Sequence, residues 1–303
     1  MHTAHALLAT ILLALGSCAS VSSGPASIRF AHLDGEAGAD FAELRATFGA
    51  ANPGYDVEWL PSCTAVPAVG SDRVLFVQGP ANLEGELTVG DIRLLPAGED
   101  WELGVGVGVD LLAFTLPTQI PADLPALVRP DWDSRITDTP GGCAEETGAY
   151  RRILLTWLEE KGPYVLHALN AHRVRITDSF SHYHPLDGGF DEIYLVQMAP
   201  PGARVVTSED VPAIEGEDVT SDEAQALLES HPLRVGDLVY MPRGTMHRGL
   251  GGALVQVISV PGFVPNSEIG LDHHLRSINE RLELEGEAAL PFHEAGSREP
   301  VVK

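Results

Sequence analysis

Four side chains in the second half of the chain have the types and the spacing of metal ligands. His182 and His184 stand two positions apart, and Glu192 follows them after a turn rich in Pro and Gly. His247 ends the pattern Gly-x5-Pro-x-Gly-x2-His, which starts at Gly236. Residues two apart on a strand face the same side of a sheet, so both imidazoles can point into one interior. We therefore predict a single metal site formed by His182, His184, Glu192 and His247.

This ligand set indicates which kind of metal would bind. Three imidazoles and one carboxylate suit one divalent transition metal, namely Fe, Mn, Ni, Cu or Zn. Four protein ligands leave about two open positions on a six-coordinate ion, as catalysis requires. Asp187 and Asp191 are alternatives for the carboxylate, but the run Glu-Ile-Tyr-Leu-Val favours Glu192.

The sequence around the last histidine occurs twice. Residues 89–98 (VGDIRLLPAG) align with residues 235–244 (VGDLVYMPRG), and residues 75–78 align with residues 194–197. The two alignments differ in offset, which indicates an insertion in the second copy that contains a helix at Thr220–Ser230. A repeat of this kind means that one architecture is used twice.

The first copy lacks the predicted ligands. Glu192 aligns with Arg73 and His247 with Trp101, and the two earlier histidines align with Cys63 and Ala65. The first half is therefore predicted to be a structural barrel that packs against its neighbour.

Together, His-x-His…Glu and Gly-x5-Pro-x-Gly-x2-His resemble the paired motifs of the cupin superfamily. The second motif matches at every fixed position, whereas the first has a longer gap between His184 and Glu192 than is usual in that superfamily. The resemblance covers roughly residues 170–262 and extends weakly to 56–117. It implies an all-β fold class: two tandem cupin-type jelly-roll barrels (double-stranded β-helices), the N-terminal one degenerate, with a few flanking helices.

The resemblance also implies a metal-dependent enzyme acting on a small-molecule substrate. Cupins with three His and one carboxylate are similar to dioxygenases, which favours Fe or Mn and an oxidoreductase. A non-redox lyase or isomerase that uses the metal as a Lewis acid is one alternative, and a non-catalytic small-ligand-binding protein is another. Besides Glu192, two residues are candidates for catalysis. Tyr194 shares a strand face with Glu192 and suits acid–base chemistry, and Arg243 suits a substrate carboxylate.

The N-terminus resembles that of an exported bacterial lipoprotein. The apolar run Ala4–Leu15 is too short to cross a bilayer, and the residues Leu15-Gly16-Ser17-Cys18 that end it resemble a lipobox. Lipid on Cys18 would anchor the protein to the cell envelope, on the periplasmic side. A plain secretory signal is the alternative. In an oxidising compartment, Cys63 and Cys143 are either two free thiols or a disulfide.

Composition and periodicity predict the partners, the helices and the segments of the chain. The 31 Gly and 22 Pro indicate many turns, and a net charge of -24 argues against nucleic acid as a partner. A homodimer and a membrane contact through the lipid anchor alone are also expected. Helices are predicted from an Asp40 cap to Asn52, over Tyr150–Lys161, over Thr220–Ser230, and from Leu271 to a stop at Gly286. The predicted segments are a signal peptide (1–17), a tether (18–27), the degenerate barrel (28–130), a connector with a helix (131–162), the metal-binding barrel (163–266), and a C-terminal helix and tail (267–303).

Overall fold

The structure, a computed structural model, describes residues 26–79, 87–103, 108–139 and 150–303. The predicted signal peptide, Cys18 and Cys143 lie outside these residues, so the predictions made for them are not tested here. Within the described ranges, Cys63 is a half-buried free thiol. No helix in the same ranges combines the length and the apolar character needed to cross a bilayer.

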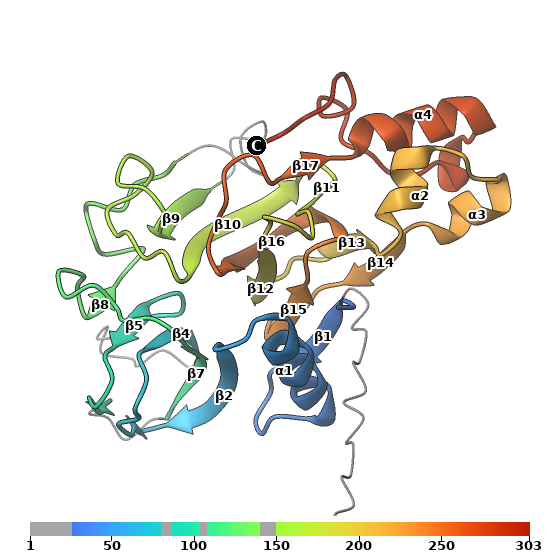
Figure 1. Ribbon diagram of the computed structural model, residues 1–303. Coiled ribbons are helices and arrows are strands. Elements are labelled where there is room, and N and C mark those ends of the chain that lie inside the picture. The colour runs from blue at the N-terminus through green and yellow to red at the C-terminus, as the bar shows by residue number, and fades with distance from the viewer. Residues whose placement is uncertain (1–25, 80–86, 104–107, 140–149) are drawn as a thin grey trace, which may run out of the picture.

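The regular secondary structure is mainly antiparallel β, in a larger sheet, a smaller sheet and a two-stranded ladder, which confirms the predicted all-β, jelly-roll-like class (Figure 1). The larger sheet follows the order β1-β15-β12-β16-β10-β9, and further short strands pair beside it. Its strands are β1 (Arg29–His32), β9 (Arg151–Leu155), β10 (Asn170–Asp178), β11 (His182–Tyr183), β12 (Asp191–Met198), β13 (Arg204–Ser208), β14 (Glu229–Pro232), β15 (Asp237–Met241), β16 (Met246–Val260) and β17 (Ile269–Gly270).

The smaller sheet belongs to the first half of the chain and follows the order β2-β7-β4-β5-β8. A separate two-stranded ladder, β3-β6, accompanies it. The strands are β2 (Asp56–Cys63), β3 (Ala65–Val66), β4 (Arg73–Gly79), β5 (Ile92–Leu95), β6 (Trp101–Glu102), β7 (Val109–Thr115) and β8 (Leu127–Val128). This half therefore forms its own smaller barrel-like unit beside the larger sheet.

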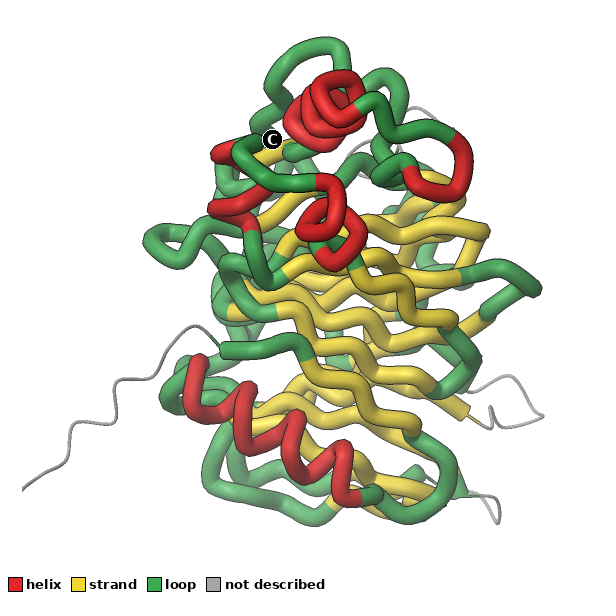
Figure 2. The backbone as a smooth tube through the Cα atoms, turned by 90° about the vertical axis from the view of Figure 1, so that its right-hand side faces the viewer, coloured by secondary structure: helices red, strands yellow, loops and turns green. Residues whose placement is uncertain are grey.

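The described helices gather at the two ends of the molecule. Figure 2 shows α1 at the end that holds the smaller sheet, and α2, α3 and α4 at the opposite end. The helices are α1 (Ala39–Ala51), α2 (Val211–Gly216), α3 (Ser221–Ala226), α4 (Asp272–Leu282) and the short 3-10 helix η2 (Gly286–Ala288).

Three of the four predicted helices are present, with corrections at their ends. The capping box of α3 is formed as predicted, because Thr220 and Glu223 bond each other's backbone N–H groups. The helix ends at Ala226, however, before the predicted end at Ser230, which lies in strand β14. The cap of α1 is Gly38, and Asp40 lies in the first turn instead. Helix α4 ends at a left-handed Glu283, before the predicted stop.

The predicted helix over Tyr150–Lys161 is wrong. Residues 151–155 form strand β9, which pairs with β10, and turns follow it. Ile153, Leu154 and Leu155 are all buried, and periodicity alone does not distinguish such a short, continuous apolar run in a strand from part of a buried helix. Trp157, beyond the strand, packs on Phe263 with ring centroids 4.1 Å apart.

The two halves pack together through a shared aromatic core. Phe114 of the smaller sheet makes an edge contact with Phe48 of α1 (centroids 5.8 Å apart), and Phe48 makes another with Tyr240 of the larger sheet (5.7 Å). These three rings are almost completely buried. Aromatic edge contacts add to the free energy gained from apolar burial, so this core holds the two sheets as one body.

Strand register confirms the internal repeat. Arg73 pairs with Leu95 in the smaller sheet as Glu192 pairs with Met241 in the larger one. Trp101 pairs with Val66 where His247 pairs with His182. The register thus confirms Arg73 and Trp101 as counterparts of ligands, but it replaces Cys63 by Val66 as the counterpart of His182.

Strand β1 crosses the boundary between the halves. Residues 29–32 lie in the first predicted barrel, yet they pair in antiparallel register with residues 237–240 of β15. The larger sheet therefore takes its edge strand from the beginning of the chain.

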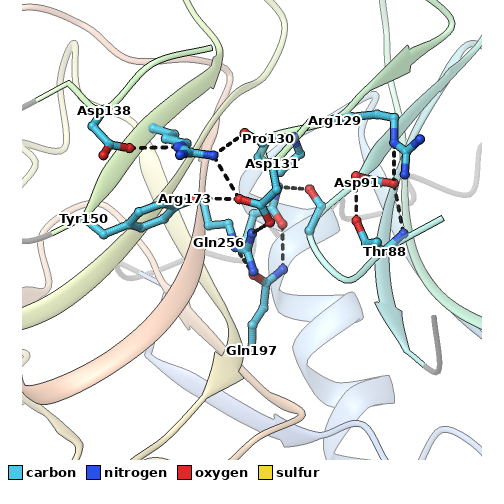
Figure 3. Close-up of polar contacts among 12 residues, drawn as sticks. Thr88, Asp91, Arg129, Pro130, Asp131, Asp138, Tyr150, Arg173, Gln197 and Gln256 are labelled. Carbon is cyan, nitrogen blue, oxygen red and sulfur yellow. Dashed lines mark hydrogen bonds and ion pairs between the residues drawn. The ribbon is translucent and has the colours of Figure 1, made fainter. Parts of the chain in front are cut away.

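The connector is fixed by ion pairs to both halves (Figure 3). Asp131 accepts hydrogen bonds from Arg173 on β10 (2.6 Å) and Arg152 on β9 (2.9 Å). Two residues earlier, Arg129 pairs at 3.1 Å with Asp91, a fully buried carboxylate of the smaller unit. These contacts hold residues 129–131 in place between the smaller unit and the strands β9 and β10.

Candidate metal centre

Strand pairing brings the four predicted ligands together. His182 on β11 lies directly opposite His247 on β16. The carbonyl of His184, just after β11, accepts a hydrogen bond of 2.7 Å from the N–H of Gly244, in the turn before β16. Glu192 on β12 lies opposite Ser259 near the other end of β16. Glu192 also lies opposite Met241 at the end of β15, and the short turn from Met241 to Met246 leads directly to His247.

The ligand atoms of the four residues all lie within 4.8 Å of one another. Oε2 of Glu192 is 3.3 Å from Nε2 of His184 and 3.6 Å from Nε2 of His247. All four side chains are buried, with at most 5% of any residue exposed. The arrangement confirms the predicted group as one that can hold a transition metal, and it favours Glu192 over Asp187 and Asp191.

The outer nitrogen atoms of the rings are held by the backbone. Nδ1 of His182 lies 3.1 Å from the carbonyl of Phe180, and Nδ1 of His247 lies 3.3 Å from that of Thr245. Such contacts fix the tautomer and leave the other nitrogen free to bind a metal. Nε2 of His184 and Nε2 of His247 are buried and have no hydrogen-bond partner among the described residues. Buried nitrogen lone pairs without a partner are costly, and a cation between them would remove that cost.

Burial sets the charge state of the site. It lowers the pKa of His182 and His184 well below the usual value, and the neighbouring His247 lowers both further. Burial alone would raise the pKa of Glu192, but the nearby His247 and then the other imidazoles lower it overall. Neutral imidazoles on His182 and His184 beside a carboxylate are in the protonation state that metal binding requires.

Among the described residues of the first half, no comparable group of ligands occurs. The counterpart of Glu192 is Arg73, which is 3% exposed and donates to the carbonyl of Pro67. A buried guanidinium repels cations, so the first unit cannot repeat the metal site.

A narrow cavity opens beside Glu192, and the sequence analysis did not find its polar residues. The space left between the side chains has room for about one water molecule. Its lining includes Arg151, His172 and Glu268, the aromatic rings of Trp157, Phe190 and Phe263, and Glu192 itself.

The two titratable neighbours in this cavity have shifted pKa values. Burial, and then the charge of Glu192, raise the pKa of Glu268 to about 7. Burial, and then the charge of Arg151, lower the pKa of His172 to about 3. Near neutral pH the cavity therefore offers a carboxyl group able to gain or lose a proton and an uncharged imidazole.

The other two predicted catalytic residues, Tyr194 and Arg243, make different contacts. Tyr194 is 1% exposed and packs in the interior of the larger sheet, with its ring centroid 6.2 Å from that of His247. Arg243 points to Asp191, with Nε 2.8 Å from Oδ1, and also donates to the carbonyl of Ala51 in α1. These contacts tie Arg243 to the packing of α1 and not to the four ligands.

Comparisons with known proteins give only distant similarities. No family model matches the chain, and no curated protein matches it. Among solved structures, oxalate decarboxylase from Bacillus subtilis shares 10% identity over 85% of this chain and 81% of that chain, with a TM-score of 0.47. Procruciferin, an 11S globulin from Brassica napus, shares 9% over 79% and 86% (TM-score 0.47). A variant of salicylate 1,2-dioxygenase from Pseudoaminobacter salicylatoxidans shares 10% over 81% and 86% (TM-score 0.47).

Proposed function

We propose that this protein is a metal-dependent enzyme of the cupin type that acts on a small molecule, with Fe or Mn and dioxygenase chemistry as the first choice. The observation that carries the proposal is the buried group of three imidazoles and one carboxylate, in which Nε2 of His184 and His247 lacks any described hydrogen-bond partner. When bound, the metal would supply an acidic centre, or a redox centre, with about two positions left for other ligands.

Two aromatic residues next to the ligands help to hold the histidine rings in position. The rings of Phe180 and Phe190 stack on His182 (centroids 4.4 Å apart) and His184 (3.8 Å). These contacts hold the imidazoles in place and keep water off their outer faces. The cavity lined by Arg151, His172 and Glu268 reaches Glu192 and has room for about one water molecule there.

Elemental analysis tests the proposal directly. The purified protein, prepared without chelators, is compared with a His182→Ala, His247→Ala variant, while His231→Ala serves as a control because that histidine lies outside the group. We expect about one transition metal per chain in the wild type and the control, and loss of the metal from the double variant. Absence of metal from the wild type would overturn the proposal.

A non-redox reaction, such as that of a lyase or isomerase, is the second candidate. The observation that favours it is Glu268, a cavity carboxyl whose pKa of about 7 suits it to general acid–base catalysis. Oxygen uptake in a screen of small substrates separates the two, because only the dioxygenase consumes O2. Turnover without O2 would favour the second candidate.

We also propose that the chain is exported and anchored by lipid on Cys18, on the strength of the sequence Leu15-Gly16-Ser17-Cys18. Labelling with radioactive palmitate in a bacterial host tests this proposal. The label is expected on the wild type and not on a Cys18→Ala variant, and an unlabelled wild type would contradict the anchor.

A further inference from the structure

The peptide unit between Phe180 and Ser181 joins one of the predicted metal ligands to a buried carboxylate. Its carbonyl, on Phe180, lies 3.1 Å from Nδ1 of His182. Its N–H, on Ser181, donates to Oδ2 of Asp272 at 2.8 Å. With a metal on Nε2, the Nδ1 atom of His182 carries the hydrogen and donates to that carbonyl. A continuous chain of hydrogen bonds therefore runs from the imidazole, through one peptide unit, to the carboxylate.

Strand pairing and the start of α4 place Asp272 at this peptide. Gly270 on β17 pairs with His182 on β11, and the N–H of Leu271 donates to the carbonyl of Ser181 at 2.8 Å. Asp272 follows as the first residue of α4, which leads away from β17 (Figure 1). A helix N-terminus stabilises negative charge, so the fold holds an anionic group against the segment that leads into β11.

The carboxylate of Asp272 is buried and held from several sides. The residue is fully buried, and its second oxygen, Oδ1, accepts a hydrogen bond of 2.8 Å from the backbone N–H of His293. A Cβ atom added to Gly296 would lie 2.7 Å from Oδ2. Burial raises the pKa of Asp272, whereas the N–H groups that it accepts favour the charged form. The carboxylate therefore has little room to turn away from Ser181.

Such an arrangement acts on the metal ligand in two ways. The carboxylate fixes the plane of the peptide and thereby the direction of the Phe180 carbonyl, which sets the orientation of the His182 ring. A charge-assisted hydrogen bond at the N–H end also polarises the peptide and strengthens the bond that its carbonyl accepts. A stronger hydrogen bond at Nδ1 makes the imidazole a better electron donor to a metal at Nε2.

We propose that Asp272 is a positioning residue of the metal site, which orients His182 and raises the affinity of the site for metal through the Phe180–Ser181 peptide. This inference rests on the proposed function and adds to it a residue that controls metal binding from outside the ligand group. Neither of the two sequence motifs contains Asp272.

Metal titration of the full chain tests the inference. Protein freed of metal is titrated with Zn2+ against a coloured chelator, and the competition gives the dissociation constant. The test variants are Asp272→Asn, which removes the charge with almost no change in size, and Gly296→Ala, whose new Cβ displaces Oδ2 and leaves every charge in place. Asp91→Asn is the matched control, because Asp91 is equally buried and accepts hydrogen bonds from Thr88 in the smaller unit.

We expect Asp272→Asn and Gly296→Ala to bind Zn2+ about tenfold more weakly than the wild type, and Asp91→Asn to bind it equally well. NMR of the Zn2+-loaded proteins supplies a second measurement, which a general loss of stability does not move. The Nδ1 proton of His182 should shift upfield in both test variants as its hydrogen bond weakens. The Nδ1 proton of His247, which lies at the carbonyl of Thr245, should stay in place.

Unchanged Zn2+ affinity or an unchanged Nδ1 resonance of His182 in Asp272→Asn overturns the inference, as does an equal loss of affinity in Asp91→Asn. If Asp272→Asn does not fold, Gly296→Ala decides by the same two measurements. A wild type that binds Zn2+ no more tightly than the test variants leaves the metal site standing without the role of Asp272. A wild type that binds no metal overturns the proposed function, and the inference with it.

Discussion

Arg243, in the turn before His247, has two possible roles. It either contacts a substrate, as the sequence suggested, or forms a structural ion pair. In the structure, Asp191 is 1% exposed and accepts hydrogen bonds from Nε and the backbone N–H of Arg243, at 2.8 and 3.0 Å. The hydroxyl of Tyr240 and the amide of Asn52 donate to its other oxygen, at 2.7 and 2.6 Å. Arg243 is thus the charge that compensates a buried carboxylate between α1 and the larger sheet.

The magnitude of the Arg243→Ala change follows from these contacts. Removing one partner of a buried ion pair costs about 3–5 kcal/mol, because the other charge stays buried without compensation. Here the side chain of Arg243 is 25% exposed, and Asp191 keeps three uncharged donors. We therefore expect the free energy of unfolding to fall by about 2–3 kcal/mol.

Urea unfolding, followed by tryptophan fluorescence at constant metal content, measures this loss. Arg234→Ala is the matched control, since Arg234 pairs with Asp237 at 3.3 Å but is 70% exposed, and its loss is expected to cost less than about 0.5 kcal/mol. The metal content should be unchanged in both variants. An Arg243→Ala protein that unfolds at the wild-type urea concentration while losing substrate binding would refute the structural role and restore Arg243 as a substrate contact.

Three further predictions concern packing, capping and pH. In Gly249→Ala, the new Cβ would lie 2.4 Å from Cγ2 of Ile176, so we expect a loss of about 1–3 kcal/mol in urea unfolding; an unchanged midpoint would contradict the packing. Thr220→Ala removes the capping box of α3 and should cost about 1 kcal/mol, with faster hydrogen exchange confined to that helix; exchange spread over the sheet would be inconsistent with this. Burial lowers the pKa of His172 from 6.5 to about 3. At a pH below about 6.5, the unfolded chain therefore binds more protons than the folded one. In the metal-free protein, His172 alone should therefore contribute a loss of about 1.4 kcal/mol for each pH unit below about 6, and His172→Gln should reduce the total slope by that amount in urea midpoints measured at pH 7 and pH 5; equal slopes would count against the buried neutral imidazole.

The metal group could be predicted from the sequence because each ligand occurs in a short local pattern. Strand alternation also explains why Glu192, and not Asp191, completes it. Glu192 shares a face with Tyr194, which packs in the interior, whereas Asp191 points the other way, to Tyr240 and Asn52. A difference of one position on a strand reverses the direction of the side chain.

The cavity residues could not be predicted in the same way. Arg151, His172 and Glu268 come from three separate segments, and only the pairing of β9 with β10 and of β11 with β17 brings those segments together. The wrong prediction of a helix over Tyr150–Lys161 also made it impossible to predict that Arg151 lies on a strand. His172 carried one usable signal: it continues the alternation of Val174 and Ile176 on β10, so it faces the same interior.

The pairing of β1 with β15 has a consequence for how the protein folds during synthesis. The ribosome makes residues 29–32 roughly two hundred residues before their partners at 237–240. The first unit can pair its own strands at once, but the larger sheet cannot receive its edge strand until nearly the whole chain has emerged. Contacts this distant along the chain slow folding, so β15 carries an open edge until β1 pairs with it. Cutting the chain at the connector would leave that edge permanently exposed, and the second half made alone should tend to associate through it.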